Sequence, residues 1–172
     1  MVKKNINAAI WLAIVAFIPA IVSCTKSVDP KLLELRKKIM LAEMPEKPIT
    51  LTEAKELLAQ ENNLVLIGKI GTGKLDPFEK GKAVFVLSEA PDDHGDSADH
   101  DANECPFCRR RIAEAPLAQV EIQDSEGTTL PFGIPDLLGL KQGQIVVVQG
   151  RGHYAQDSDM LFIKGTAVFA KR

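Results

Sequence analysis

The chain has no excess of positive charge and few aromatic residues. Its 21 lysines and arginines face 23 acidic residues, which gives a net charge of −2 with neutral histidines, and aromatic residues make up 5% of the chain. A mildly acidic protein has no general attraction to polyphosphate backbones. The composition therefore argues against a nucleic-acid-binding protein, which depends on a basic groove lined with aromatic stacking platforms.

The chain also lacks an apolar stretch long enough to span a membrane. Its longest such stretch, residues 8–22, falls short of the roughly 20 residues that a spanning helix needs, and no basic stop-transfer cluster directly follows it. Lys3 and Lys4 precede the stretch, and Ser23 and Cys24 end it. This layout is typical of a secretory signal, so we expect an N-terminal signal helix that is removed from the mature protein.

The end of this segment, Ile21-Val22-Ser23-Cys24, resembles the lipobox of bacterial lipoproteins. The resemblance implies that residues 1–23 are a signal peptide and that Cys24 carries acyl chains, which together hold a protein on a bilayer. Thr25, in place of aspartate, implies the periplasmic side of the outer membrane rather than the inner membrane. Cleavage removes two lysines and no acids, which leaves 19 basic and 23 acidic residues and a net charge of −4.

Motifs of the common hydrolases are absent as well. The chain has no Ser-His-Asp order and no G-x-S-x-G elbow. Residues 68–74 fit G-x4-G-K, the start of a phosphate-binding loop, but Leu75 stands where a hydroxyl should bind Mg²⁺, and Pro77 interrupts the helix that should follow. We interpret these glycines as a hairpin turn, and no feature supports a hydrolytic enzyme.

Residues 24–61 are predicted to be a lipid anchor, a tether and short helices. Leu32, Leu35 and Ile39 recur at helical spacing among basic residues, which indicates an amphipathic helix. We interpret it as a spacer between the lipid and the domain, and docking of its basic face on a membrane surface is the alternative. Thr50 and Glu53 have the T-x-x-E spacing of a capping box, which predicts a second helix up to residue 60.

Residues 62–172 are predicted to be mainly β. Short apolar segments separated by turn residues predict strands at 64–70, 82–88, 118–123, 144–149 and 161–170, with a short helix at 135–140. This order, with the glycine-bounded segments 68–70 and 143–150, resembles uncharacterised exported bacterial OB-fold proteins. The resemblance implies a small five-stranded OB-like Greek-key barrel, which closes its own edges. We expect Phe85, Phe162 and Phe169 in its core.

His153 is the third histidine of the chain and lies in the segment 150–154. We expect this segment to be a loop between the last two strands that leaves the sheet away from the long loop described next. His153 is accordingly predicted to be exposed to solvent.

The long loop at residues 89–116 contains H-x5-H-x4-C-x2-C, formed by His94, His100, Cys105 and Cys108. These are the side chains that bind Zn²⁺ in tetrahedral sites, and a C-x2-C turn brings two thiolates onto one ion. A loop of this length in a compact domain is usually functional. We therefore predict a metal-binding loop, most simply for a structural zinc ion, in a membrane-anchored binding or scaffold module whose partner the sequence does not name.

Two alternatives remain for the cysteines. Thiolates also favour Cu(I). In an oxidising compartment Cys105 and Cys108 would form a disulfide, and the sequence Cys105-Pro106-Phe107-Cys108 resembles the dithiol of thioredoxin-type proteins, which implies a membrane-attached thiol–disulfide oxidoreductase. Against it, no parallel α/β pattern flanks the pair, and the histidines would have no role.

Overall fold

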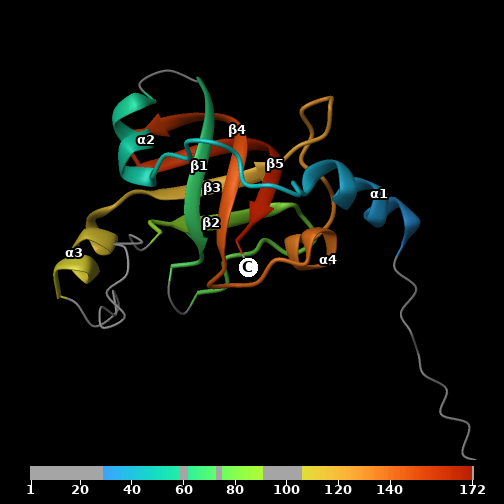
Figure 1. The fold of residues 1–172 in the computed structure, drawn as a ribbon, viewed down its shortest axis with the longest axis horizontal. Helices are drawn as coiled ribbons and strands as arrows, with labels where there is room; N and C mark the ends of the chain where they lie inside the picture. Colours follow the sequence, from blue (N-terminus) through green and yellow to red (C-terminus); the bar gives the residue numbers. More distant parts are fainter. Residues whose placement is uncertain (1–28, 59–61, 73–74, 91–105, 172) are drawn as a thin grey trace, which may run out of the picture.

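The computed structural model describes residues 29–58, 62–72, 75–90 and 106–171. Two helices, α1 (Pro30–Ile39) and α2 (Leu51–Leu57), precede the strands β1 (Asn62–Ile70) and β2 (Val84–Ser88). Helix α3 (Pro106–Glu114) leads into β3 (Leu117–Ile122), and α4 (Ile134–Leu138) comes before β4 (Ile145–Ala155) and β5 (Met160–Ala170). Figure 1 shows α1 at one end of the molecule and α2 and α3 at the other.

The five strands form a mixed sheet that closes on itself. Their order is β1-β2-β3-β5-β4, and β4 pairs with β1 to complete a ring of hydrogen bonds. The β3–β5 pair is parallel, and the other pairs are antiparallel. The prediction of a mainly β fold is therefore confirmed, and all five predicted strands are present.

The strand β4 is much longer than predicted. It runs on to Ala155 and pairs with β5 from Val146 to Ala155, so residues 150–154 are strand and not the predicted loop. Glycine alternates there with polar residues, which hides the strand pattern, because buried Gly152 has no side chain to mark the inward face. His153 is exposed, as predicted.

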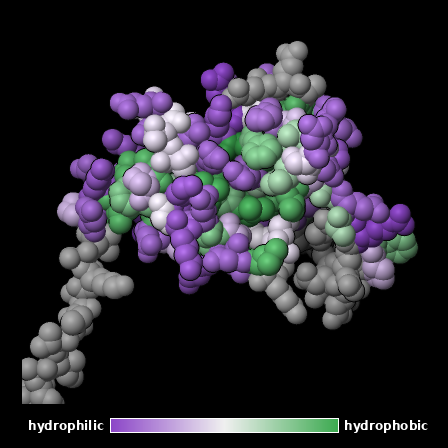
Figure 2. Space-filling model, turned by 180° about the vertical axis from the view of Figure 1, so that it is seen from behind, coloured by the Kyte–Doolittle hydropathy of each residue, from purple (hydrophilic) through white to green (hydrophobic). Residues whose placement is uncertain are grey.

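The core lies inside the closed sheet and under the helices. Phe85 is fully buried there, together with aliphatic side chains from every strand. The predictions for Phe162 and Phe169 are wrong, because both are half-buried and lie outside the core cluster. Strand alternation places Phe162 on the outer face, between the buried residues Leu161 and Ile163. Seen from behind, the molecule exposes apolar residues near its middle, surrounded by hydrophilic ones (Figure 2).

Both helices before the sheet pack on this core. Thr50 and Glu53 form the predicted capping box of α2, which ends at Leu57, earlier than expected. In α1, Ile39 is buried in the core cluster and Leu32 packs against it. The amphipathic helix is thus confirmed, but α1 is part of the packed structure and not only a spacer.

Helix α4 and α1 meet at a glycine. Gly139 ends α4 in the left-handed region, with φ 73°, and a side chain added there would meet the guanidinium of Arg36 from α1. Only glycine adopts this conformation without strain and also leaves room for the arginine. The predicted helix at 135–140 is present as Ile134–Leu138.

The pairing of β4 and β5 shifts register at a bulge after Gln149, where the two backbones lie close together. A Cβ atom added to Gly150 would meet the carbonyl oxygen of Lys164 and would lie 3.0 Å from the Cα of Gly165. The neighbouring atoms are backbone atoms of a paired strand, so they cannot move aside without breaking the pairing. Glycine is therefore required at this position by the closure of the sheet.

We expect Gly150→Ala to lower the free energy of unfolding by about 2–3 kcal/mol, because overpacking against backbone costs this much. Gly127→Ala is the matched control: Gly127 has φ 80° but no atom within 4 Å of an added Cβ. Its cost is about 1 kcal/mol, from backbone strain alone. Urea denaturation measures both, and equal losses would contradict the close-approach argument.

Candidate functional site

The predicted metal ligands and the predicted lipidation site fall largely outside the described residues. His94, His100, Cys105 and Cys24 all lie there. Cys108 lies in α3, but its side chain is likewise outside the description. Among the described residues, no group of three or more His, Cys, Asp and Glu side chains is arranged to hold a metal ion. Within the same part of the chain, no helix has the length and apolarity needed to cross a membrane.

The two ends of the long segment 89–116 lie side by side. Leu87, near the end of β2, pairs with Ala118, near the start of β3. The chain therefore leaves the sheet after Ser88 and returns to the neighbouring position at Leu117. The segment that contains the predicted ligands is thus inserted at one place in the sheet, and strand pairing fixes its two ends.

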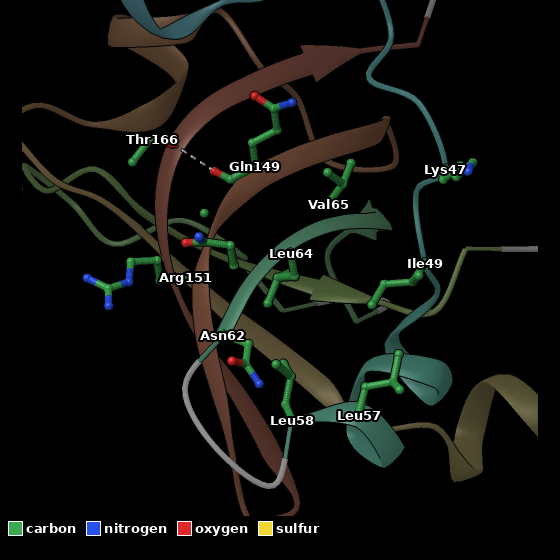
Figure 3. A pocket seen from close by; sticks show the side chains of 12 residues that line it. Lys47, Ile49, Leu57, Leu58, Asn62, Leu64, Val65, Gln149, Arg151 and Thr166 are labelled. Atoms are coloured by element: carbon green, nitrogen blue, oxygen red, sulfur yellow. Dashed lines mark hydrogen bonds between the residues drawn. The ribbon is translucent and has the colours of Figure 1, made fainter.

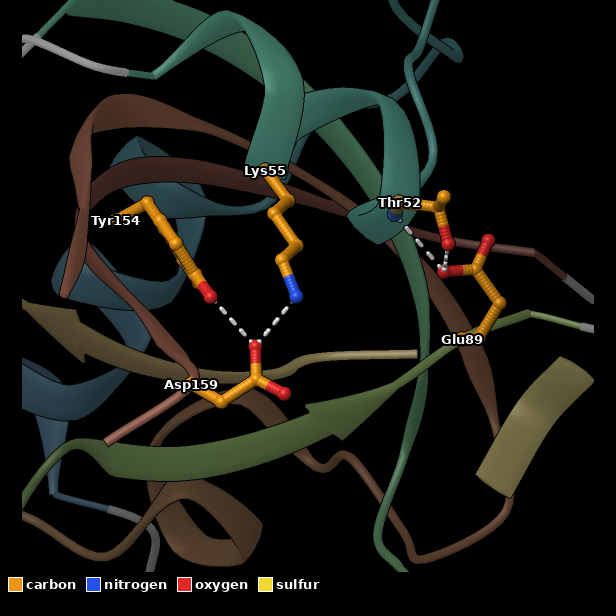
Figure 4. Close-up of polar contacts among 5 residues, drawn as sticks. All are labelled: Thr52, Lys55, Glu89, Tyr154 and Asp159. Atoms are coloured by element: carbon orange, nitrogen blue, oxygen red, sulfur yellow. Dashed lines mark hydrogen bonds and ion pairs between the residues drawn. The ribbon is translucent and has the colours of Figure 1, made fainter. Parts of the chain in front are cut away.

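Glu89, the first residue of this segment, is held against α2. It is only 4% exposed, and its Oε2 accepts hydrogen bonds from the backbone N–H (3.1 Å) and the Oγ1 (3.2 Å) of Thr52, in the first turn of the helix (Figure 4). A carboxylate at this position satisfies a backbone N–H that has no partner within the helix. The segment therefore begins at a fixed point between β2 and α2.

The other end of the segment is formed by α3. Phe107 is 85% exposed, and Arg110 pairs with Glu114 through a 2.7 Å contact on the helix surface. Pro116 is then buried where the chain joins β3. Helix α3 thus presents a large apolar side chain and a basic one to solvent.

The opposite end of α2 is tied to the β4–β5 hairpin. Asp159 Oδ1 accepts a 2.7 Å contact from Lys55 Nζ and a 2.6 Å hydrogen bond from the hydroxyl of Tyr154 (Figure 4). The ammonium of Lys55 also lies 5.1 Å from the centre of the Tyr154 ring, within the range of a cation–π contact. The backbone N–H of Tyr154 donates to the carbonyl of Leu58. The hairpin and Glu89 therefore contact the same helix, contrary to the prediction that they point in opposite directions.

These contacts shift two pKa values. The hydrogen bond from Lys55, followed by that from Tyr154, lowers the pKa of Asp159. The pKa of Lys55 is raised, mainly by its hydrogen bond to Asp159 and then by its contact with Tyr154. Both groups are exposed to solvent, so the ion pair contributes little to stability. Sequence reasoning missed the cluster because Lys55 and Asp159 are 104 positions apart.

A hollow of about 290 Å³ lies on the outer face of β3, β4 and β5. The rings of His153 and Phe162 stack there, with centroids 5.6 Å apart and planes at 19°. Lys164, Arg151 and Glu121 supply charges of both signs around the rings. The Glu121 carboxylate accepts hydrogen bonds from Gln119 on β3 and from Gln123 and Thr129 in the turn after it.

A larger groove of about 700 Å³ is lined by the end of α2, by Lys47 and Ile49, and by residues of β1, β4 and β5 (Figure 3). Leu57, Leu58 and Leu64 give it an apolar side, and Asn62 and Arg151 a polar one.

The sequence matches no protein-family model, and neither the curated proteins nor the solved structures contain a significant match to it.

The pKa of Asp159 can be tested by NMR titration of its carboxyl carbon. We expect a midpoint below the usual aspartate range, so the stabilising contact is present above the ordinary pKa and is lost as the pH falls through the lowered one. Lys55→Met should raise the midpoint, and Tyr154→Phe should raise it by less. Lys80→Met, which removes an exposed lysine from elsewhere, should leave it unchanged. An Asp159 midpoint that is the same in Lys55→Met and in the wild type would show that Lys55 does not cause the lowered pKa.

Proposed function

We propose that this chain is a lipid-anchored, extracytoplasmic OB-like β-barrel that binds one zinc ion through His94, His100, Cys105 and Cys108. The main support for this proposal is that the four residues lie in one inserted segment with the pattern H-x5-H-x4-C-x2-C. The two strands that flank this segment pair with each other. Fixed ends reduce the conformational entropy that a loop loses when it closes around an ion. The module binds or scaffolds a partner in the cell envelope.

The arrangement of the strands supports an OB-like Greek-key barrel. Five strands close in the order β1-β2-β3-β5-β4, the third and fifth are parallel, and α4 lies between the third and fourth in sequence. A small barrel of this kind presents loops and one sheet face for binding. Fold alone does not assign a ligand, so the proposal rests on the chemistry of the inserted segment.

Zinc fits the ligand set. Two thiolates and two imidazoles complete a tetrahedral site with no open position, which is the coordination of a structural ion. The segment also contains acids, such as Asp92 and Asp93, that are suited to accept the outer N–H of a histidine ligand. The proposed ion orders the segment and performs no reaction.

The leader supports attachment to the envelope. Lys3 and Lys4, the apolar residues 8–22 and the lipobox ending at Cys24 follow one another in the order of a lipoprotein signal. Thr25 favours the outer membrane. The acyl chains on Cys24 then hold the domain on the periplasmic side.

Metal analysis of the acylated full chain tests the zinc proposal. We expect about one zinc per chain and two alkylatable thiols in protein purified without reducing agent, because a four-ligand site takes one ion. His94→Ala and His100→Ala should each lower the zinc content and the melting temperature. The matched control is His153→Ala, which should retain the zinc. Copper in place of zinc would assign the site to Cu(I), and histidine variants with full metal content would contradict the four-ligand set.

Labelling with radioactive fatty acid tests the anchor. Cys24→Ser should abolish incorporation and leave an uncleaved or soluble precursor, because the acceptor sulfur is missing. Cys108→Ser should be labelled like the wild type. Unchanged labelling of Cys24→Ser would refute the lipobox assignment.

A thiol–disulfide oxidoreductase is the second candidate, and the start of α3 favours it. Helix α3 begins at Pro106, the residue that follows Cys105 in the sequence. In thiol–disulfide oxidoreductases the reactive thiol belongs to a dithiol at the start of a helix. In this case the purified chain should contain no metal, a Cys105–Cys108 disulfide and insulin reductase activity. The same metal and thiol measurements therefore separate the two functions.

A further inference from the structure

The position of α1 limits how the domain sits on a membrane. If Cys24 is acylated, as proposed above, only four residues separate it from Asp29, which caps α1. Five peptide units span at most about 18 Å. The start of α1 must therefore lie within that distance of the acylated cysteine at the bilayer surface.

The helix cannot move independently of the sheet. Ile39 is buried in the core, the backbone N–H of Leu41 donates to the carbonyl of Val168 in β5 (2.8 Å), and Met40 forms a parallel bridge with the same residue. Arg36 packs over the end of α4 at Gly139. A short tether on a fixed helix thus sets the orientation of the whole domain.

The outer side of α1 suits an anionic surface. Lys31, Lys37 and Lys38 are exposed, and Leu33 between them is 43% exposed. Glu34 is the single acid of the helix, whereas the mature chain carries a net charge of −4. Lysines beside an apolar side chain are attracted to anionic lipid headgroups, while the acidic remainder of the domain is repelled.

We propose that the exposed side of α1 rests on anionic phospholipid headgroups and that the domain stands on its α1 end. Helices α2 and α3 lie at the other end of the molecule (Figure 1), and Glu89 begins the ligand-bearing segment beside α2. In this orientation the α2 and α3 end points away from the bilayer. A soluble partner, or a partner attached to the other membrane, can then reach it.

Tryptophan fluorescence tests the orientation. Trp11 is the only tryptophan and is lost with the signal peptide, so the mature chain has none. The acylated variants Leu33→Trp and Leu57→Trp, both at exposed positions, are reconstituted in phosphatidylglycerol vesicles that contain brominated lipid. We expect strong quenching and a blue shift for Leu33→Trp, and neither for Leu57→Trp. Equal quenching, or quenching of Leu57→Trp alone, would overturn the proposal.

Chemical labelling of lysines in the wild-type chain gives a second readout, which does not depend on whether a substituted chain folds. An impermeant amine reagent should modify Lys37 and Lys38 severalfold less on phosphatidylglycerol vesicles than in detergent. It should modify Lys55, in α2 at the other end of the molecule, equally in both. Replacing phosphatidylglycerol by phosphatidylcholine should weaken the protection. Lys37→Glu should reduce quenching of Leu33→Trp, and the matched charge reversal Lys55→Glu should not. Protection of Lys55 in place of Lys37 would contradict the proposed orientation.

Intact mass distinguishes failure of the anchor from failure of the orientation. A chain without acyl groups would contradict both the lipid anchor and the proposed orientation. An acylated chain whose Lys37 and Lys38 remain as reactive as in detergent would overturn the orientation and leave the anchor intact.

Discussion

Closure of the sheet is the constraint on which the other features depend. The strand β5 pairs with β3 on one side and β4 on the other, and β4 also pairs with β1. The two backbones lie close together where Gly150 pairs with Gly165, and these glycines let the two long strands bend around a small core. Within this ring β2 and β3 are antiparallel neighbours, so the end of β2 lies beside the start of β3. The segment that contains the predicted metal ligands leaves and returns at this junction.

Helix α2 links three parts of the molecule. An isolated helix of seven residues is not stable in water, so its contacts hold it in place. Its first turn binds Glu89, its apolar residues Leu51 and Ala54 enter the core, and Lys55 reaches the β4–β5 hairpin. Glu89 and the hairpin therefore contact one helix, Glu89 at its first turn and the hairpin at Lys55.

The two proposals divide the molecule between its ends. The α1 end combines a short tether, a fixed helix and three exposed lysines, which suits attachment to a lipid surface. The α2 and α3 end combines the inserted segment with an exposed Phe107 and is suited to contact a partner. Attachment at one end and binding at the other allow an anchored protein to act beyond the headgroup layer.

The sequence by itself determined the features that rest on neighbouring residues. The capping box of Thr50 and Glu53, the amphipathic α1 and the five alternating apolar segments were all predictable, because short-range periodicity and local hydrogen bonds specify them. The ligand spacing from His94 to Cys108 is also a local pattern, and it stays a prediction. Only the tertiary structure decided that residues 150–154 continue β4, that Phe162 faces outward, and that Glu89 and Asp159 meet α2. Those outcomes depend on strand pairing and on contacts between residues far apart in the chain, for which no neighbouring residue carries a signal.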